Sequence, residues 1–342
     1  VKETTTVTKD VSGSLLISAA DGATLKGIQI GGDLILAPGV TKDVTLVDCV
    51  IQGNIRNYGT GEVRFEAPQI TPESTATKPS EVYKPGATLD RTLEYGGKTV
   101  PIYRDRPLNV FSDVDFIWTG EENENQRRLE YLGGEFRTRY GIDVSSFQGE
   151  IDWDAVADDN IDFAMVRVGF RGTGTGSLNT DKYYEQNIRG AMRAGLETGV
   201  YFFAQAVTVE EAIEEADYVI SLLDGLDING PVAYDWEMHD STYRVYGTSP
   251  EMATACAVAF CQRIKDAGYT PMVYGGTYVT YMKYDQGALA DYLSWYPEYK
   301  SEKSEKLCPT LVYHMDYWQF SSSRAVAGIN GRVDMNIQFI RR

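Results

Sequence analysis

The chain has 342 residues, an apolar fraction of 43% and a formal net charge of −17 at pH 7. This length suits two domains with a connecting segment, and the apolar content is sufficient for a sizeable core. Because neutralising phosphates requires clustered Lys and Arg, the acidic balance argues against a nucleic-acid-binding protein.

The first seventy residues contain an internal repeat. The stretch ATLKGIQIGGDLIL (23–36) matches VTLVDCVIQGNIRN (44–57) at an offset of 21 residues, residue 23 against residue 44. Short β-branched strands interrupted by glycine at that period are typical of a parallel β-solenoid. Residues 1–70 are therefore predicted to form a small all-β solenoid-like accessory domain. A structural spacer is favoured over a wall-binding module, because no ladder of aromatic side chains marks a binding face.

Two segments of different composition follow. Residues 71–92 are rich in Pro, Ser and Thr and show little apolar periodicity, which predicts a linker. Residues 93–138 mix aromatic with charged residues, so we expect an extension that packs on the next domain.

Residues 139–342 alternate between strand and helix patterns. The strands are predicted at 140–146, 162–169, 197–204, 231–238, 270–276, 292–299, 313–320 and 333–339, and the helices near 152–159, 182–194, 208–224, 249–267 and 277–283. Thr208 before two glutamates is a reasonable helix start. The pattern predicts an α/β fold, a TIM-like (β/α) barrel with a reduced helix count.

Acidic residues stand at several predicted strand ends. In such barrels the active site lies at the carboxyl ends of the strands, where the sequence has Asp143, Asp235, Glu237, Asp316 and Asp334. Asp235 and Glu237 alternate around a tryptophan, so both point to one side of the strand. A carboxyl pair with separated pKa values is what sugar hydrolysis requires. The alternative is a solvated strand end whose acids form ion pairs.

Four segments resemble the signature sequences of the glycoside hydrolase family 25 lysozymes, the N-acetylmuramidases. They are YGIDVSSFQGEIDWDAV (140–156), GVYFFA (199–204), PVAYDWE (231–237) and YWQFSSSRAVAGINGRVDMN (317–336). The resemblance covers residues from about 138 to 340, in the family's order and spacing. It implies a flattened β/α barrel with fewer than eight helices, secretion by bacteria or phage, and cleavage of the β-1,4 bond between N-acetylmuramic acid and N-acetylglucosamine in peptidoglycan.

The same resemblance implies roles for four acids. Glu237 would be the general acid, and Asp235 would stabilise the oxocarbenium-like centre directly or by orienting the substrate's acetamido group. Asp143 and Asp334 would hold this pair by charge and hydrogen bonds. The family preference is substrate-assisted retention. The Cβ spacing of two residues along a strand, about 6.7 Å, lies between the separations expected of retaining and inverting enzymes.

Candidate substrate-binding residues lie on or beside the same strand ends. Aromatic rings there would stack on sugars, and amide side chains would bond N-acetyl or hydroxyl groups. The predicted contacts are Tyr201, Phe203, Gln148, Trp295, Tyr296, Trp318 and Gln319. For each ring the alternative is packing inside the barrel, as it is for Tyr234. Arg167 is expected to be a charge partner of the acidic centre.

No metal or organic cofactor is required by this chemistry, and none is predicted. The expected partner is the peptidoglycan glycan strand. The sequence contains no run of 18 apolar residues, the length needed to span a membrane. The start VKETTTVTKD lacks the features of a signal peptide, so the chain is either intracellular or a trimmed mature form. The resemblance favours a secreted or cell-wall-associated protein.

Two other functions remain open. A wall-binding or scaffold protein would keep the barrel without turnover, although all four acids are present. A chitinase-like enzyme would carry a longer D-x-x-D-x-D-x-E string, whose earlier aspartates NGPVAYDWE lacks. Among the cysteines, Cys261 and Cys308 form a candidate pair, whereas Cys256 and Cys261 lie about 140° apart on a shared helix and are not expected to pair.

Overall fold

The computed structural model describes residues 6–7, 11–18, 23–47, 49–51, 55–66, 77–86, 88–120 and 127–342. The chain divides into two compact units, Val1–Thr75 and Ala76–Arg342. Each unit is described by itself.

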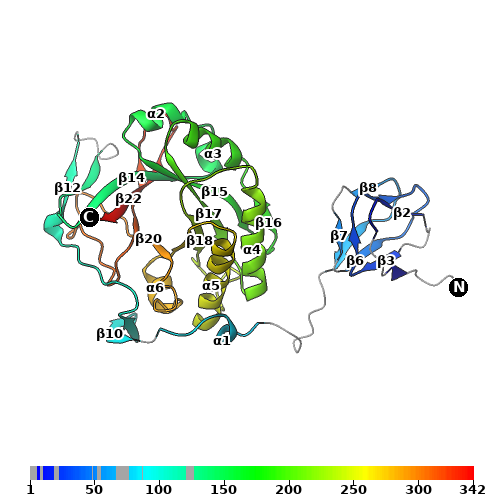
Figure 1. The fold of residues 1–342 in the computed structure, drawn as a ribbon, viewed down its shortest axis with the longest axis horizontal. Coiled ribbons are helices and arrows are strands. Elements are labelled where there is room, and N and C mark those ends of the chain that lie inside the picture. Colours follow the sequence, from blue (N-terminus) through cyan, green and yellow to red (C-terminus); the bar gives the residue numbers. More distant parts are fainter. Residues whose placement is uncertain are drawn as a thin grey trace. The chain divides into compact units, whose positions relative to one another are not determined.

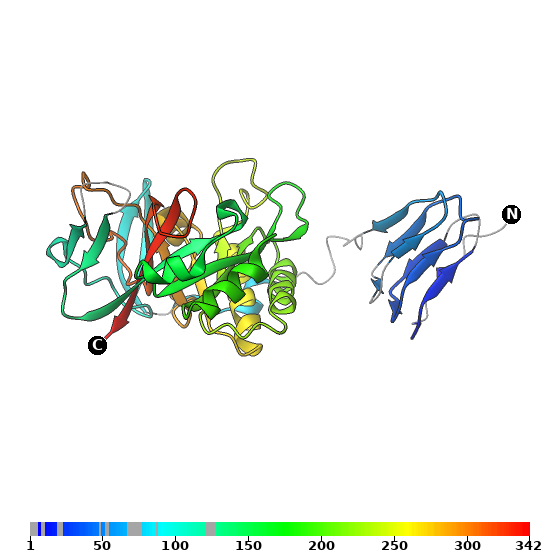
Figure 2. The same ribbon diagram turned by 90° about the horizontal axis from the view of Figure 1, so that it is seen from above.

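The N-terminal unit consists of short strands in its described residues. They are β1 (Thr6–Val7), β2 (Leu15–Ile17), β3 (Ala23–Lys26), β4 (Gln29–Ile30), β5 (Leu34–Leu36), β6 (Val44–Val47), β7 (Val50–Ile51), β8 (Ile55–Asn57) and β9 (Val63–Glu66). Parallel pairing arranges them in three sheets, β1-β3-β6-β9, β2-β5-β8 and β4-β7 (Figure 2). The offset of the sequence repeat is also the pairing register, since Thr24 pairs with Thr45 and Leu34 with Ile55.

The second unit begins with a helix and two hairpins that precede the barrel strands. It contains α1 (Pro79–Val82), the hairpin of β10 (Leu89–Tyr95) and β11 (Lys98–Tyr103), and the hairpin of β12 (Phe116–Thr119) and β13 (Arg128–Tyr131). The structure therefore differs from the predicted linker, because α1 and the first part of β10 fall within residues 71–92. Carboxylates of the barrel hold this segment in place. The backbone N–H of Thr77 donates to Glu210, and that of Gly86 donates to Asp285.

A mixed sheet forms the centre of the second unit. Its strands are β14 (Phe136–Val144), β15 (Phe163–Arg171), β16 (Leu178–Thr180), β17 (Glu197–Ala204), β18 (Val232–Trp236), β19 (Pro271–Tyr274), β20 (Leu293–Pro297), β21 (Tyr317–Arg324) and β22 (Val333–Arg341). They are ordered β14-β22-β21-β20-β19-β18-β17-β15-β16, and a further pairing of β14 with β15 makes the sheet barrel-like. The eight strands predicted from the sequence are confirmed, although β21 begins later than predicted.

The direction of the last strand departs from a TIM barrel, whose eight strands are parallel. β22 runs antiparallel to both β14 and β21. A parallel return needs a crossover of about a dozen residues or more, and the connection 325–332 is too short. Because β22 is reversed, its first residues lie beside the carboxyl ends of the other strands.

The predicted helices are confirmed, with ends that differ by a few residues. They are α2 (Trp153–Asp158), α3 (Tyr184–Arg193), α4 (Val209–Leu222), α5 (Pro250–Asp266) and α6 (Thr277–Met282). The side chains of Asp152, Thr208 and Ser249 cap α2, α4 and α5 by accepting a backbone N–H from the first turn. In Figure 1, α2 to α5 lie on the outer side of the ring of strands, and β12 lies on the opposite flank.

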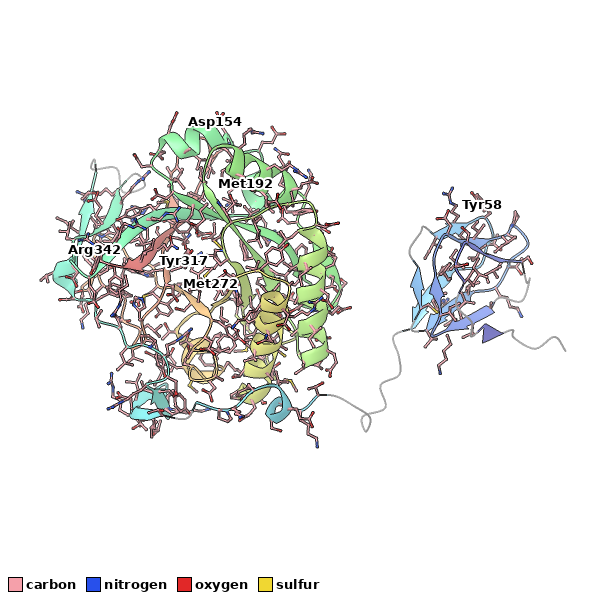
Figure 3. All side chains as sticks on the ribbon, viewed as in Figure 1. Tyr58, Asp154, Met192, Met272, Tyr317 and Arg342 are labelled. Carbon is pink, nitrogen blue, oxygen red and sulfur yellow. The ribbon has the colours of Figure 1, made fainter. Side chains whose placement is uncertain are left out.

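In the second unit, the alternation of side chains along the strands gives two apolar cores. The larger core fills the space between the sheet and its outer cover. A smaller one fills the ring, with Phe163, Met165, Met272, Trp295 and Tyr317 among its members. Figure 3 shows Met272 and Tyr317 inside the ring of strands.

The cysteines are all unpaired. The candidate pair of Cys261 with Cys308 is therefore wrong: Cys261 is buried on α5, with its thiol 3.9 Å from the Met272 carbonyl oxygen, whereas the backbone N–H of Cys308 donates to Asp113. Among the described residues, no helix has the length and apolarity needed to cross a membrane.

Candidate active site

Asp235 and Glu237 lie at the end of β18. All five residues of this strand are buried, and Glu237 directly follows it. Asp235 points into the ring, whereas the indole of Trp236 points outward and donates to the Ala206 carbonyl oxygen at 3.1 Å. The pleat therefore places both carboxyl groups on the side of the ring interior.

Asp143 and Asp334 face each other across β14 and β22. They are direct partners in the antiparallel register, so their side chains lie on the same face. Burial, and then the charge of Asp143, raises the pKa of Asp334 to about 8. Burial is also the largest cause that raises the pKa of Asp143 to about 6. At neutral pH this pair therefore holds one proton and one negative charge.

Asp143 is fixed by two amide side chains. Gln319 Nε2 donates to Asp143 Oδ2 at 2.9 Å, and Asn336 Nδ2 donates to the same oxygen at 2.8 Å. Trp295 Nε1 in turn donates to Asn336 Oδ1 at 2.8 Å. Both hydrogen bonds to Asp143 favour its ionised form and oppose the effect of burial on its pKa.

Asp235 and Glu237 form a second coupled pair with unequal access to solvent. Asp235 is 5% exposed, and the side chain of Glu237 is 28% exposed. Burial, the charge of Glu237 and a hydrogen bond with Glu237 raise the pKa of Asp235 well above its usual range. Glu237 Oε2 also lies 3.0 Å from Nε2 of His239, an exposed side chain. The pair therefore places a buried acid with a raised pKa beside a carboxyl group at the surface of the cleft.

These acids share one cleft of about 350 Å³. It is lined by Asp143, Ser145, Phe147, Gln148, Arg167, Tyr201, Phe203, Asp235, Glu237, His239, Tyr274, Trp295, Tyr299, Gln319 and Asp334. A second cavity of about 410 Å³ adjoins it and shares Glu237, His239, Tyr274 and Tyr299. Its other lining residues, among them Met238, Tyr278 and Pro297, are largely apolar. Glu237 thus stands between an acidic cavity and an apolar one.

Most of the predicted substrate contacts lie in the cleft, and two do not. Tyr201, Phe203, Gln148, Trp295 and Gln319 line it. Tyr296 is buried outside the ring, where its hydroxyl bonds Thr277 at 2.7 Å. Trp318 is fully buried and donates to the Glu298 carbonyl oxygen at 3.0 Å. Both occupy the outward positions of their strands, and so does Tyr234, which packs on Phe260.

Further residues of the site were not predicted from the sequence. They are the cleft residues Ser145, Phe147, His239, Tyr274 and Tyr299, and the buried Asn336 that donates to Asp143. The hydroxyls of Tyr274 and Tyr299 both donate to Gln319 Oε1 at 3.1 Å. Strand alternation contained a signal for two of them: Asn336 is two residues from Asp334, and Tyr274 ends its strand. Nothing in the sequence pattern marks the loop residues Phe147, His239 and Tyr299.

Arg167 lines the cleft, and its direct ion-pair partner is Asp181, which is not one of the four predicted acids. Its Nε donates to the buried carboxylate of Asp181 at 2.9 Å, and its Nη2 donates to Ser146 Oγ at 3.2 Å. The charge of Arg167 nonetheless acts against the rise in the pKa of Asp235. Within the described part of the chain, no three His, Cys, Asp or Glu side chains are grouped to hold a metal ion.

Asp316 lies apart from this centre. Its carboxylate accepts the backbone N–H of Ser294 at 2.8 Å and the hydroxyl of Ser294 at 3.1 Å. It precedes β21 and does not line the cleft. Asp316 is therefore a structural acid of the β20–β21 edge.

Comparisons with known proteins agree with this arrangement. Residues 142–329 match the model of the glycosyl hydrolases family 25. The chain is 26% identical over 197 residues to the autolytic lysozyme of Clostridium acetobutylicum, a match that covers 57% of this chain and 54% of that protein. It is 27% identical over 201 residues to lysozyme M1 of Streptomyces globisporus, covering 57% of this chain and 66% of that protein. The chain thus spans between half and two thirds of these two relatives.

Solved structures share the fold. The spore cortex lytic enzyme SleM of Clostridium perfringens superposes with a TM-score of 0.51 at 22% identity, over 59% of this chain and 67% of that one. The family model covers more than half of the sequence, and the matched region holds Asp143, Asp235 and Glu237. The chain therefore belongs to the glycosyl hydrolases family 25.

Proposed function

We propose that this protein is a peptidoglycan hydrolase, a muramidase that cleaves the β-1,4 bond between N-acetylmuramic acid and N-acetylglucosamine. One observation carries the proposal: buried Asp235, whose pKa is raised by burial and by the charge of Glu237, lines the same cleft as Glu237. Sugar hydrolysis needs one carboxyl group that gives a proton and one that carries negative charge. Membership of family 25 and the two lysozymes among the relatives support the same activity.

In the proposed reaction, the proton shared by Asp235 and Glu237 passes from Glu237 to the oxygen that bridges the two sugars. The glycosidic bond breaks, its electron pair stays on the departing oxygen, and positive charge develops at the anomeric carbon. Asp235, now a carboxylate, stabilises that carbon directly or through the substrate's acetamido group. In the substrate-assisted route, the acetamido oxygen bonds the anomeric carbon on the face opposite the departing oxygen. Water then displaces that acetamido oxygen and gives a proton to Glu237, so the configuration is retained.

Asp143 and Asp334, on β14 and β22, tune this pair from other strands of the ring. With pKa values of about 6 and about 8, Asp143 is ionised and Asp334 is protonated at pH 7. One negative charge therefore faces Asp235 and Glu237 instead of two. Charge repulsion from Asp143 adds to the raised pKa of Asp235 and keeps a proton in the cluster.

The proposed substrate indicates where the protein acts, and the strand pairing supports a description of its two domains. We place the protein at the cell wall, outside the cytoplasm, because the glycan is found there. The ring of strands with outer helices supports a TIM-like description of residues 139–342. The pairing register of residues 23–57 supports a solenoid-like accessory module for residues 1–70.

Release of reducing sugar from purified cell walls tests the proposal. We expect Glu237→Gln to lower the rate by about a hundredfold to ten-thousandfold, because it removes the proton donor. Asp224→Asn, a change of an exposed acid beyond α4, is the matched control and should leave the rate unchanged. Full activity in Glu237→Gln would remove the acid assignment. An intact protein that binds walls without releasing sugar would instead be a binding module.

A further inference from the structure

Phe147 exposes its ring at the edge of the cleft. Its side chain is 85% exposed, yet it lines the cavity that holds the four acids. Removing a phenyl ring from water is favourable, so this ring offers binding surface to whatever enters the cleft.

The backbone of Phe147 is held in place on both sides. Residues Ser146–Gln148 form a single 3-10 turn, and Gln148 Oε1 accepts the N–H of Ser145 at 2.9 Å. Ser145 Oγ accepts the N–H of Phe147 at 3.3 Å. The N–H of Ser146 donates at 3.0 Å to Asp181, whose side chain is fully buried. The ring is therefore presented by a fixed turn.

One face of the ring lies near a cation. The guanidinium carbon of Arg167 lies 5.1 Å from the centre of the Phe147 ring and 5.5 Å from the centre of the Phe170 ring. Asp181 binds this guanidinium at 2.8 Å and 2.9 Å, and the Arg167 side chain is only 14% exposed. Arg167 thus lies against one side of Phe147, and the exposed ring remains accessible.

We propose that Phe147 is a stacking platform for one N-acetylhexosamine ring of the glycan strand, with Arg167 as its support. Pyranose rings joined by β-1,4 bonds present faces of C–H groups, which suit an open aromatic face. Phe147 is absent from the second cavity that shares Glu237, so the platform serves a sugar in the acidic cavity. This inference rests on the proposed function and assigns a substrate contact to a residue with no role in proton transfer.

Kinetics on soluble, peptide-free glycan strands test the platform. Phe147→Ala should raise KM roughly tenfold to hundredfold, the loss expected when a buried phenyl contact is removed. The value of kcat should stay within about twofold, because the contact is the same in ground and transition states. Phe147→Trp should restore KM to within about threefold of the original, since it renews the ring face.

Val114→Ala is the matched control. Val114 is 83% exposed and does not line the cleft, so its loss should not change KM. An unchanged KM in Phe147→Ala, while Glu237→Gln is inactive, would overturn the platform and leave the proposed function intact. Failure of the wild-type protein to cleave these strands would overturn both. Equal melting temperatures of the variants would exclude misfolding as the cause of any change in KM.

Discussion

At the scale of single residues, the chemistry depends on how the environment divides protons among like groups. Asp143 has two amide donors on one oxygen. Asp334, its partner across the strands, has the higher pKa of about 8. Hydrogen bonds from Gln319 and Asn336 favour charge on Asp143. The amides therefore decide which of two facing aspartates is ionised.

Removing one of these amides should shift the pH dependence of catalysis. Gln319→Leu takes a donor from Asp143, and its pKa should rise from about 6 by about one unit. If activity requires ionised Asp143, the acid limb of kcat/KM moves to higher pH by the same amount. Rates of wall digestion between pH 4 and pH 9 measure this, with Gln262→Ala on the exposed face of α5 as the control. An acid limb that stays in place would show that Asp143 is a bystander.

The pleat decides which aromatic residues can meet substrate. The sequence predicts substrate contacts at two pairs of adjacent residues, Trp295 with Tyr296 and Trp318 with Gln319. Neighbours on a strand face opposite ways, so one member of each pair lies outside the ring. The positions of the four acids could be predicted because they stand at the ends of predicted strands. Phe147 lies in a matching segment too, but its exposure follows from a loop, which has no sequence periodicity.

At the scale of elements, the turn between β17 and α4 supports the acid from below. Gln205 in this turn is fully buried, and its Nε2 donates to the Glu237 carbonyl oxygen at 2.8 Å. Its N–H donates to Glu215 at 3.0 Å, and its carbonyl oxygen accepts from Arg244 at 2.8 Å. The turn is thus fixed at three points and holds the main chain at Glu237.

Gln205→Leu should therefore damage catalysis more than substrate binding. The change leaves the Glu237 carbonyl without its amide donor, which costs about 1 to 2 kcal/mol of unfolding free energy. We expect kcat to fall about tenfold while KM changes little, because displacement of an acid by even 1 Å is costly. Steady-state kinetics and urea unfolding measure both effects. A loss of stability with an unchanged kcat would mean that Gln205 serves the fold alone.

Element prediction succeeded where local patterns carry the information. The eight strands and five helices follow from apolar periodicity, and the caps of α2, α4 and α5 use Asp, Thr and Ser. Strand direction is not a local property. The only sequence signal for the reversal of β22 is the short connection 325–332, which leaves no room for a parallel crossover.

At the scale of the whole molecule, the segment before the barrel is part of its core. Phe111 packs on Phe136 and Phe339 with ring centres 5.3 Å and 4.4 Å apart. Arg106 is buried and donates to the carbonyl oxygens of Leu289 and Tyr292 at 3.0 Å and 2.7 Å. Phe111 and Arg106 therefore cover a surface that the barrel strands leave open.

Truncation should reveal this dependence. A fragment of residues 76–342 keeps the second unit whole and should unfold cooperatively and digest walls. A fragment of residues 139–342 loses Phe111, Arg106 and the first residues of β14, which pair with the end of β22. We expect it to be insoluble or at least 3 kcal/mol less stable, about the cost of one large core truncation. Equal stability of the two fragments, measured by urea unfolding, would contradict this.

The buried carboxyl groups should make the fold more stable in mild acid. Burial is the largest cause that raises the pKa of Asp143 to about 6, of Glu215 to about 7 and of Asp334 to about 8. The folded chain then binds protons more tightly than the unfolded chain, so stability is lost as pH rises from about 4 to 8. Unfolding free energy should fall between pH 5 and pH 8.

Asp334→Asn is the matched test of this pH dependence. It removes the carboxyl group with the highest of these three pKa values, which would otherwise be charged and buried at pH 9. The free energy of unfolding at pH 9 should therefore rise by about 1 to 3 kcal/mol. Its effect should shrink at pH 5, where Asp334 is protonated in the folded protein. Stability that increases from pH 5 to pH 8 would contradict the assignment.

The central claim is that Glu237, supplied with a proton by its buried neighbour, opens one kind of glycosidic bond in the wall. Mass analysis of borohydride-reduced wall digests tests it most directly, because the reduced sugar at each new end identifies the bond that was cut. The account predicts reduced N-acetylmuramic acid at the new ends, and almost none after treatment with Glu237→Gln. New ends carrying reduced N-acetylglucosamine, or undiminished cleavage by Glu237→Gln, would contradict it.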